Sequence, residues 1–379
     1  MRTPWKSRFR ALHRWLALAA SLPLIVVATT GALLAFPEQT RRILSGDGPA
    51  AAAGGGLLPP SALLSAVEAA LPEGESVSRL HYPAVPGHLL IAETPGYRVA
   101  LDPSTAGVRR VTPVGRDPVA VLTRIHVELV AGEAGRWVTG LSAGALVLLC
   151  GSGLRLWWPV GRWRASYFLV KLDVGWKRAN FDLHRASGLA FVLPLLLMGL
   201  TGATIAFWAV VAPIIYLLTW SGPTTRPDLN VRPPSAGASM ISPDRALAVA
   251  MARHPGFEPR RFYPPAGPDR PYRVFLDPPG EHEVRVNEAR LEIDPYTGEI
   301  LFEEGPRSMS RGDRVLRWIL PLHFGTFGGP ATRLLYLAAC LGPIPLAATG
   351  AVLWWNRRRK RPARRAGAPG EPARSLQSA

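Results

Sequence analysis

Residues 12–36 read LHRWLALAASLPLIVVATTGALLAF, and residues 183–207 read LHRASGLAFVLPLLLMGLTGATIAF. At a constant offset of 171 the two stretches are identical at 13 of 25 positions. Each contains an apolar run of about 20 residues, the length that a helix needs to cross the hydrocarbon core of a bilayer. A cleavable signal peptide has a shorter apolar core and cannot stand at residue 183. Both stretches are therefore predicted to span a membrane.

A second pair of stretches also matches, because residues 126–158 align with residues 323–355 at an offset of 197 without a gap. The identities in this pair include His126/His323, Gly132/Gly329, Arg136/Arg333, Gly153/Gly350 and the tryptophan pairs 157–158 and 354–355. With the first pair, these stretches predict four spans at residues 15–36, 137–158, 183–207 and 334–355, the third being apolar as far as residue 220.

The order of the repeated stretches predicts a duplicated unit of span, outer domain and span. Both copies begin on the same side, so the pseudo-twofold axis is expected along the membrane normal. The predicted fold is a membrane α-helical protein, a four-helix transmembrane bundle with two small α+β domains outside the membrane. The predicted divisions are the N-terminal segment and first span (1–36), the first outer domain (37–125), a histidine segment and second span (126–158), a loop (159–182), the third span and its extension (183–220), the second outer domain (221–322), a histidine segment and fourth span (323–356), and a basic tail (357–379).

Composition and charge agree with a membrane protein. The 379 residues are 48% hydrophobic and 19% charged, whereas soluble domains carry about 25% charged residues. The net charge of +17 lies almost entirely in residues 1–14, 159–185 and 357–379, while the two outer domains are close to neutral. Positive residues collect on the cytoplasmic side. Both termini are therefore predicted in the cytoplasm of a bacterium, with the protein in the inner membrane and the outer domains in the periplasm. Since topology explains the basic residues, a nucleic-acid partner is not expected.

Each outer domain shows one short helix followed by strands. In the first, a helix is predicted at 63–71 with Ser61 as its N-cap, and strands at 77–82, 89–93, 97–101 and 108–111. In the second, Ser242 begins a helix that ends near residue 253, and strands are predicted at 272–276, 291–293 and 299–302.

These motifs occur in a recognisable order. The LHRW…P…TTG…F pattern, the Asp-Pro hairpin turns after a short helix and the terminal LWW resemble the PepSY-associated transmembrane helix family over residues 8–360. The resemblance implies an iron-regulated inner-membrane protein linked to siderophore iron. Some members are regarded as dihaem b-type reductases that release iron from ferric siderophores, and the family as a whole is functionally mixed.

Four of the eight histidines are repeated, and they form the candidate site. His13 and His184 begin spans on the inner side, and His126 and His323 precede spans on the outer side. A single histidine at a helix end is more often an interfacial anchor, but matched pairs and the resemblance favour haem ligation. We therefore expect two b-type haems, each with two histidines as axial iron ligands.

Neighbouring residues suit the same role. Arg14 and Arg185 each follow a proposed ligand, where they are expected to pair with haem propionates or lipid phosphates. Small residues in the spans allow a flat macrocycle or another helix to approach closely; they are Gly31, Gly153, Gly202 and Gly350. The tryptophan pairs are expected at the cytoplasmic interface, and Pro23 and Pro194 are expected to kink their helices.

Several other chemistries lack their motifs. The two cysteines form no CxxC or CxxCH, and the sequence contains no GxGxxG after a strand, no HExxH and no hydrolase triad. No flavin or nicotinamide site and no further catalytic residue is assigned, so the electron donor would be a separate partner. His81, His88, His254 and His282 lack metal-site spacing and are expected at the surface.

The sequence thus favours transmembrane electron transfer that reduces a ferric siderophore or another ferric chelate in the periplasm. Two alternatives stay open. One is a non-enzymatic membrane-anchored PepSY scaffold or binding protein, and the other is a component of an iron-chelate transporter.

Overall fold

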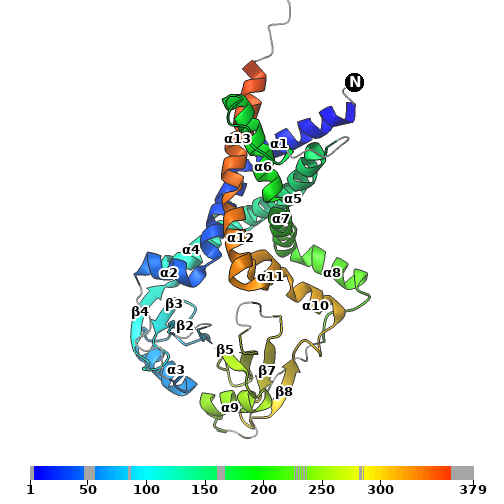
Figure 1. Ribbon diagram of the computed structural model, residues 1–379. Coiled ribbons are helices and arrows are strands. Elements are labelled where there is room, and N and C mark those ends of the chain that lie inside the picture. Colours follow the sequence, from blue (N-terminus) through cyan, green and yellow to red (C-terminus); the bar gives the residue numbers. More distant parts are fainter. Residues whose placement is uncertain are drawn as a thin grey trace, which may run out of the picture.

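The computed structural model describes residues 4–46, 56–83, 87–159, 167–225, 237–280 and 286–359, and positions 227, 229, 231, 233, 235 and 284. A bundle of helices stands at one end of the molecule and a β-sheet at the other (Figure 1). The first helix begins and the last described helix ends at the end of the bundle far from the sheet (Figure 1). The two ends of the described chain therefore lie on the same side of the bundle.

The bundle contains the apolar helices that the sequence predicts. Among the described residues, three stretches are long and apolar enough to cross a membrane, and a bent pair of helices makes a possible fourth. The three stretches lie in α1 (Pro4–Leu34), in α5 (Gly132–Trp157), and in α12 (Gly329–Leu341) with α13 (Pro343–Arg359). The bent pair is α6 (Trp176–Ala190) and α7 (Val192–Ala206), which meet at 59°. The chain is thus a membrane helical protein that also carries a β-sheet.

The two prolines that were expected to kink their helices behave differently. Helix α1 runs through Pro23 as one helix, whereas Pro194 lies in the first turn of α7, just after the bend. A proline ring clashes with the carbonyl four residues earlier. For Pro194 that residue is Ala190, the last residue of α6, which explains why the helix breaks there.

Short helices lie between the bundle and the sheet. They are α2 (Pro37–Ser45), α4 (Pro118–Glu128), α8 (Trp208–Leu218), α10 (Arg311–Arg317) and α11 (Ile319–Phe324) (Figure 1). The chain folds back between α4 and α5 through residues with positive φ, including Leu129 and Gly132. A Cβ on Gly135 would stand 1.6 Å from the Glu128 carbonyl oxygen, so only glycine permits this turn. Gly325 and Gly329 have positive φ in the matching turn after α11.

The two outer domains share one sheet. Its eight antiparallel strands have the order β4-β3-β2-β1-β5-β6-β7-β8. The strands are β1 (Arg79–His81), β2 (Leu90–Glu93), β3 (Tyr97–Leu101), β4 (Val108–Pro113), β5 (Glu258–Tyr263), β6 (Tyr272–Asp277), β7 (Ala289–Ile293) and β8 (Ile300–Glu304). Strand β1 pairs with β5, with Leu80 opposite Phe262. The sequence analysis did not predict β5 or the joining of the domains.

Helices α3 (Pro60–Ala69) and α9 (Pro243–Arg253) cover one face of this sheet. Leu63 and Ala246 from these helices, and Leu80 and Phe262 from the strands, are fully buried in one core. Ser242 is the N-cap of α9, as predicted. The prediction for Ser61 is wrong, because Pro59 is the N-cap of α3. Instead, the Ser61 hydroxyl donates to Asp244 of α9 at 2.6 Å and links the two domains.

Candidate cofactor site

His13 on α1 packs against α5. Its Nδ1 lies 2.8 Å from the hydroxyl of Ser152, and that hydroxyl donates to the carbonyl of Leu148, four residues earlier, at 2.6 Å. The ring lies against Gly153, where an added Cβ would come within 3.4 Å of the imidazole. A serine and a glycine on the second span thus hold the histidine of the first.

His184 on α6 makes the matching contacts with α13. Its Nδ1 lies 2.8 Å from the hydroxyl of Thr349, which donates to the carbonyl of Pro345 at 2.6 Å. A Cβ on Gly350 would stand 3.4 Å from the ring. The three matching positions in the first copy are His13, Ser152 and Gly153, at the offsets of 171 and 197.

His126 on α4 packs against α1. Its Nδ1 lies 2.9 Å from the carbonyl of Val27 and 3.2 Å from the hydroxyl of Thr30. That hydroxyl donates to the carbonyl of Val26 at 2.8 Å. A Cβ on Gly31 would stand 3.0 Å from the ring, so this imidazole is the most tightly fitted of the four.

His323 on α11 packs against α7 in the same way. Its Nδ1 lies 3.0 Å from the hydroxyl of Thr201, which donates to the carbonyl of Leu197 at 2.6 Å. A Cβ on Gly202 would stand 3.3 Å from the ring. Each repeated histidine therefore faces a hydroxyl residue followed by glycine on another helix.

These hydrogen bonds assign the protonation of the rings. A hydroxyl has one proton, and each of the four gives it to a carbonyl of its own helix. The hydroxyl oxygen must then accept a hydrogen bond from the Nδ1–H group of the histidine. In a neutral imidazole this leaves the lone pair on Nε2, the atom that can ligate a metal. Fixing a ligand ring through its other nitrogen is what supporting hydrogen bonds do in metal sites.

The outer pair also has a suitable separation. The ring centroids of His126 and His323 lie 6.2 Å apart, with an interplanar angle of 62°. Two imidazoles on opposite sides of one metal ion would have centroids roughly 6 Å apart, because each metal–nitrogen bond is about 2 Å long. The Nδ1 atoms are held by two different helices, α1 and α7.

The donor set fits a haem better than a metal ion that is held by protein ligands alone. Within the described ranges, no group of three or more His, Cys, Asp or Glu side chains is arranged to hold a metal ion. Haem needs only two axial ligands from the protein, since its porphyrin supplies the other four. Two imidazoles with a free Nε2, beside glycines that leave space, meet that requirement.

The two arginines next to the inner histidines have different surroundings. Arg185 pairs with the fully buried Asp182 at 2.9 Å, which also pairs with Arg178 at 2.8 Å. Arg14 lies over the ring of Trp15 at 5.2 Å, and position 11, which matches Asp182, is alanine. Arg185 thus shares a carboxylate partner within the protein, and Arg14 lacks the equivalent carboxylate.

The comparisons with known proteins agree with this architecture. The family model described as the PepSY-associated TM region matches residues 10–357, nearly the whole chain. The chain belongs to the PepSY-associated TM family. A Pseudomonas aeruginosa protein that is named only as uncharacterized is 31% identical to this family member over 262 residues. That match covers 64% of each chain.

Three of the other histidines of this family member lie in the sheet domain, each close to a glutamate. His88 Nδ1 lies 2.5 Å from Glu38, and His254 Nε2 lies 3.1 Å from Glu303. His81 lies 3.7 Å from Glu93. All three side chains are partly buried beside these glutamates. His282 lies outside the described residues.

Sequence reasoning found the four histidines and four glycines but missed the hydroxyl residues. The missed signal was present, since a serine or threonine precedes the repeated glycine in all four spans: Thr30, Ser152, Thr201 and Thr349. These residues are polar groups in largely apolar helices, and they form two sets: Thr30 and Thr201 face His126 and His323, and Ser152 and Thr349 face His13 and His184.

Proposed function

We propose that this chain carries electrons across the membrane through two bis-histidine b-type haems and reduces a ferric siderophore on the outer side. The observation that carries the proposal is an arrangement that occurs four times. In each case a hydroxyl accepts a hydrogen bond from Nδ1–H of a histidine, so that Nε2 is available to ligate iron. A merely interfacial histidine has no need for a hydroxyl acceptor and an adjacent glycine on a second helix. The same arrangement recurs four times at the sequence offsets of the repeat.

The proposal includes the layout of the chain in the membrane. We infer two copies of a span–domain–span unit, with α6 and α7 counted as one bent span, which makes a four-helix bundle. The segregation of positive charge supports an inner-membrane protein with both termini in the cytoplasm and the sheet in the periplasm. His13 and His184 would then lie near the inner face, and His126 and His323 near the outer face.

The residues of the chain have separate parts in this scheme. The histidines present Nε2 as axial ligands, the hydroxyl residues hold each ring in one orientation, and the glycines leave room beside it. Arg14, with no carboxylate in the position of Asp182, is suited to a haem propionate. Haem, when bound, supplies one-electron oxidation and reduction within a helix bundle whose spans contain few charged residues.

The outer substrate would be reduced by a single electron. Hard oxygen chelators hold ferric iron more tightly than ferrous iron because of its higher charge, so reduction weakens the complex and releases the metal. The reaction would make the protein a ferric-chelate reductase. Its electron donor would be a partner protein, a soluble reductant or a membrane quinol.

The first experiment is a haem count on purified full-length protein by the pyridine haemochrome method, with a reduced-minus-oxidised spectrum. Two b-type haems per chain are expected. Exchange of His13 or His184 for alanine should remove one haem, and exchange of His126 or His323 should remove the other. A colourless protein from haem-supplied cells would exclude the proposal and favour the alternative of a non-enzymatic membrane-anchored scaffold.

The second experiment separates reduction from transport. Protein in liposomes, supplied with a reductant on the inner side, should reduce an external ferric chelate without moving the chelate inside. Uptake of the intact chelate in the absence of any reductant would instead favour the transporter alternative.

A further inference from the structure

The face of the sheet opposite α3 and α9 carries a layer of arginines. Strands alternate their side chains between faces, and the core residues on the helix-covered face include Leu80, Val99, Phe262, Val274 and Leu291. Their strand neighbours therefore point toward the bundle. Five of these neighbours form what we call the arginine layer: Arg79, Arg98, Arg261, Arg273 and Arg290.

Two aromatic rings lie within the arginine layer. The guanidinium of Arg261 lies 4.0 Å from the centroid of Phe275. Arg79 and Arg273 lie 5.5 Å and 5.0 Å from the centroid of Tyr263. Tyr263 and Phe275 are neighbours on β5 and β6, with ring centroids 5.6 Å apart. Guanidinium groups and aromatic rings together form a surface that stacks on flat aryl groups.

Positive charge exceeds negative charge in the arginine layer. Arg79 and Arg98 share Glu93. Arg273 and Arg290 share Glu292, and Arg261 pairs with Glu288. Three glutamates thus serve five arginines. The nearby pair of Arg41 and Asp117 adds one charge of each sign. The side chains of Arg79 and Arg273 are 32% and 44% exposed, so part of this charge is open to a ligand.

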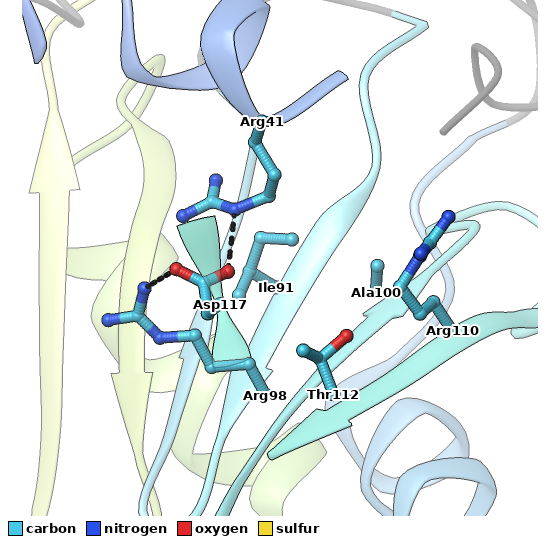
Figure 2. A pocket seen from close by; sticks show the side chains of 7 residues that line it. All are labelled: Arg41, Ile91, Arg98, Ala100, Arg110, Thr112 and Asp117. Atoms are coloured by element: carbon cyan, nitrogen blue, oxygen red, sulfur yellow. Dashed lines mark hydrogen bonds and ion pairs between the residues drawn. The ribbon is translucent and has the colours of Figure 1, made fainter. Parts of the chain in front are cut away.

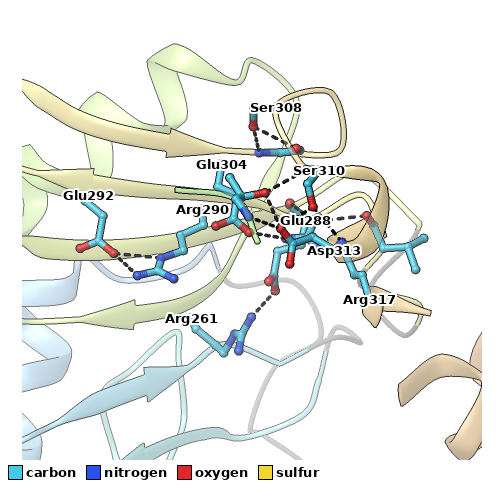
Figure 3. A network of polar contacts seen from close by, with 12 residues as sticks. Arg261, Glu288, Arg290, Glu292, Glu304, Ser308, Ser310, Asp313 and Arg317 are labelled. Atoms are coloured by element: carbon cyan, nitrogen blue, oxygen red, sulfur yellow. Dashed lines mark hydrogen bonds and ion pairs between the residues drawn. The ribbon is translucent and has the colours of Figure 1, made fainter. Parts of the chain in front are cut away.

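The arginine layer is also attached to α4, which carries His126, and to α10, which directly precedes the helix of His323. In Figure 2, Arg98 and Arg41 converge on Asp117, the N-cap of α4, with Arg98 at 2.9 Å. In Figure 3, Arg261 contacts Glu288, and the backbone of Glu288 accepts from Arg317 at 2.9 Å. Arg317 ends α10, directly before the helix of His323. A ligand on this layer would therefore lie on the side of the sheet that faces the outer histidines.

We propose that the arginine layer binds a polyanionic aryl ferric chelate of the catecholate class. Three doubly deprotonated catecholates around ferric iron leave a triply negative complex with flat aryl groups on its surface. That complex matches both the excess positive charge and the rings of Tyr263 and Phe275. A tris(hydroxamate) complex of ferric iron is neutral and has no aryl group, so it matches neither. The proposal rests on the proposed function for the fate of the iron, whereas the binding itself needs no haem.

Gallium(III) complexes separate binding from reduction, because gallium(III) is not reduced under conditions that reduce iron. The experiment measures binding of gallium tris(catecholate) and gallium tris(hydroxamate) to the full-length protein in detergent by titration calorimetry. We expect clear preference for the catecholate complex. Exchange of Arg273 or Arg79 for glutamine should weaken its binding roughly tenfold each, the effect of one lost charge-assisted hydrogen bond. F275L should weaken it by removing the stacking ring.

The matched control is R245Q, because Arg245 is exposed on α9, on the other face of the sheet. This variant should bind like the unaltered protein. Equal binding of the two gallium complexes, no binding of the catecholate, or equal losses in R245Q and R273Q would each overturn the proposal. If gallium catecholate binds but the protein contains no haem, the binding site stands and the proposed function fails.

Discussion

At the scale of single residues, the orientation of an imidazole is decided by one hydroxyl and one glycine. The four repeated histidines each lie against such a pair, at Thr30-Gly31, Ser152-Gly153, Thr201-Gly202 and Thr349-Gly350. In an apolar bundle a hydroxyl group must find a partner. Here each hydroxyl has two hydrogen-bond partners, since it donates to a carbonyl of its own helix and accepts from a histidine on another helix. The two residues therefore fix which nitrogen can ligate a metal.

Exchange of Ser152 for alanine tests the acceptor of the His13 proton. We expect haem at the inner pair to be held roughly 10- to 100-fold more weakly, the usual effect of losing a hydrogen bond that supports a ligand. The measurement is haem per chain after prolonged washing in detergent. S142A is the matched control, because Ser142 is a buried serine of the same helix that also donates to a carbonyl four residues earlier. Equal haem loss in both variants would contradict the assigned role.

Exchange of Gly31 for alanine tests the space beside His126. The new Cβ would stand 3.0 Å from the imidazole, closer than normal contact, whereas the same change at Gly153 leaves 3.4 Å to His13. Overpacking of this kind costs about 1–3 kcal/mol. We expect G31A to lose haem from the outer pair and G153A to keep its haem. Optical spectra of both variants measure the difference, and the reverse order would show that the imidazoles do not face these glycines when haem is bound.

At the scale of helices and strands, the sequence predicted the elements better than their connections. The apolar runs predicted the membrane helices because length and hydropathy alone decide whether a helix can span. The fold-back of α4 can be derived from the sequence, because His126 stands eleven residues before the predicted span at 137–158, too far for one straight helix to bring it to the bundle. Strand β5 was missed because its sequence, EPRRFY, begins with charge and proline. Its pairing with β1 depends on contacts between residues far apart in the chain, which local patterns do not record.

The candidate site was predicted only in part, because it too depends on contacts between residues far apart in the chain. Duplication identified His13, His126, His184 and His323, but which helix each ring contacts depends on packing within the bundle. The role of Ser152 or Thr349 becomes visible only when the facing imidazole is in place. Arg185 was assigned to a propionate or phosphate, and its pairing with Asp182 follows from their shared helix face, three residues apart.

Asp117 connects an element of the sheet to an element of the bundle. Its carboxylate caps α4 through the Ala120 amide at 2.7 Å and pairs with Arg98 and Arg41. D117N should keep the cap but lose the charge pairs, and D117A should lose both. We expect D117A to be destabilised by about 1 kcal/mol more than D117N, the value of one cap. Thermal unfolding measures this order, with D269N at an exposed carboxylate as the control; equal midpoints for the two Asp117 variants would refute the capping role.

Glu93 makes the stability of the sheet depend on pH. Burial alone would raise the pKa of this carboxyl, but the nearby His81, the hydrogen bond from Arg79 and the charge of Arg98 outweigh burial and hold the pKa at about 2, against an ordinary value of 4.5. A carboxyl with a lowered pKa stabilises the fold at pH values above its ordinary pKa. That contribution should be lost as the pH falls from about 4.5 toward 2.

Hydrogen exchange of β1–β3, corrected for the intrinsic rate at each pH, measures this loss. E93Q should be less protected at neutral pH and should change less between pH 5 and pH 3, a window of about two units around the ordinary pKa. E299Q, at an exposed glutamate in the turn before β8, should behave like the unaltered protein. An unchanged pH profile in E93Q would remove Glu93 as the source of the pH dependence.

At the scale of the whole molecule, the shared sheet joins the two halves of the chain into one domain at one end of the bundle. The β1–β5 pairing and the bond from Ser61 to Asp244 join domains that are separated in sequence by two membrane segments. The sheet stands at one end of the bundle, and the start of α1 and the end of α13 stand at the other (Figure 1). The arginine layer, on the side of the sheet that faces the bundle, therefore lies on the same side of the membrane as His126 and His323.

The distribution of charge predicts which side that is. Residues 1–14, 159–185 and 357–379 hold nearly all of the excess positive charge, and the start of α1 and the end of α13, which belong to two of these segments, lie at the end of the bundle away from the sheet (Figure 1). A green fluorescent protein fused after the C-terminus should therefore fluoresce, because it would fold in the cytoplasm. Alkaline phosphatase inserted at Gly280, in the turn after β6, should be active because its disulfides form only in the oxidising periplasm. The same phosphatase placed at Gly175, just before α6, should be inactive and serves as the control.

Activity at Gly175 with none at Gly280 would place the sheet in the cytoplasm, where it could not meet a siderophore arriving from outside. The direction of the proposed electron transfer would then have to be reversed.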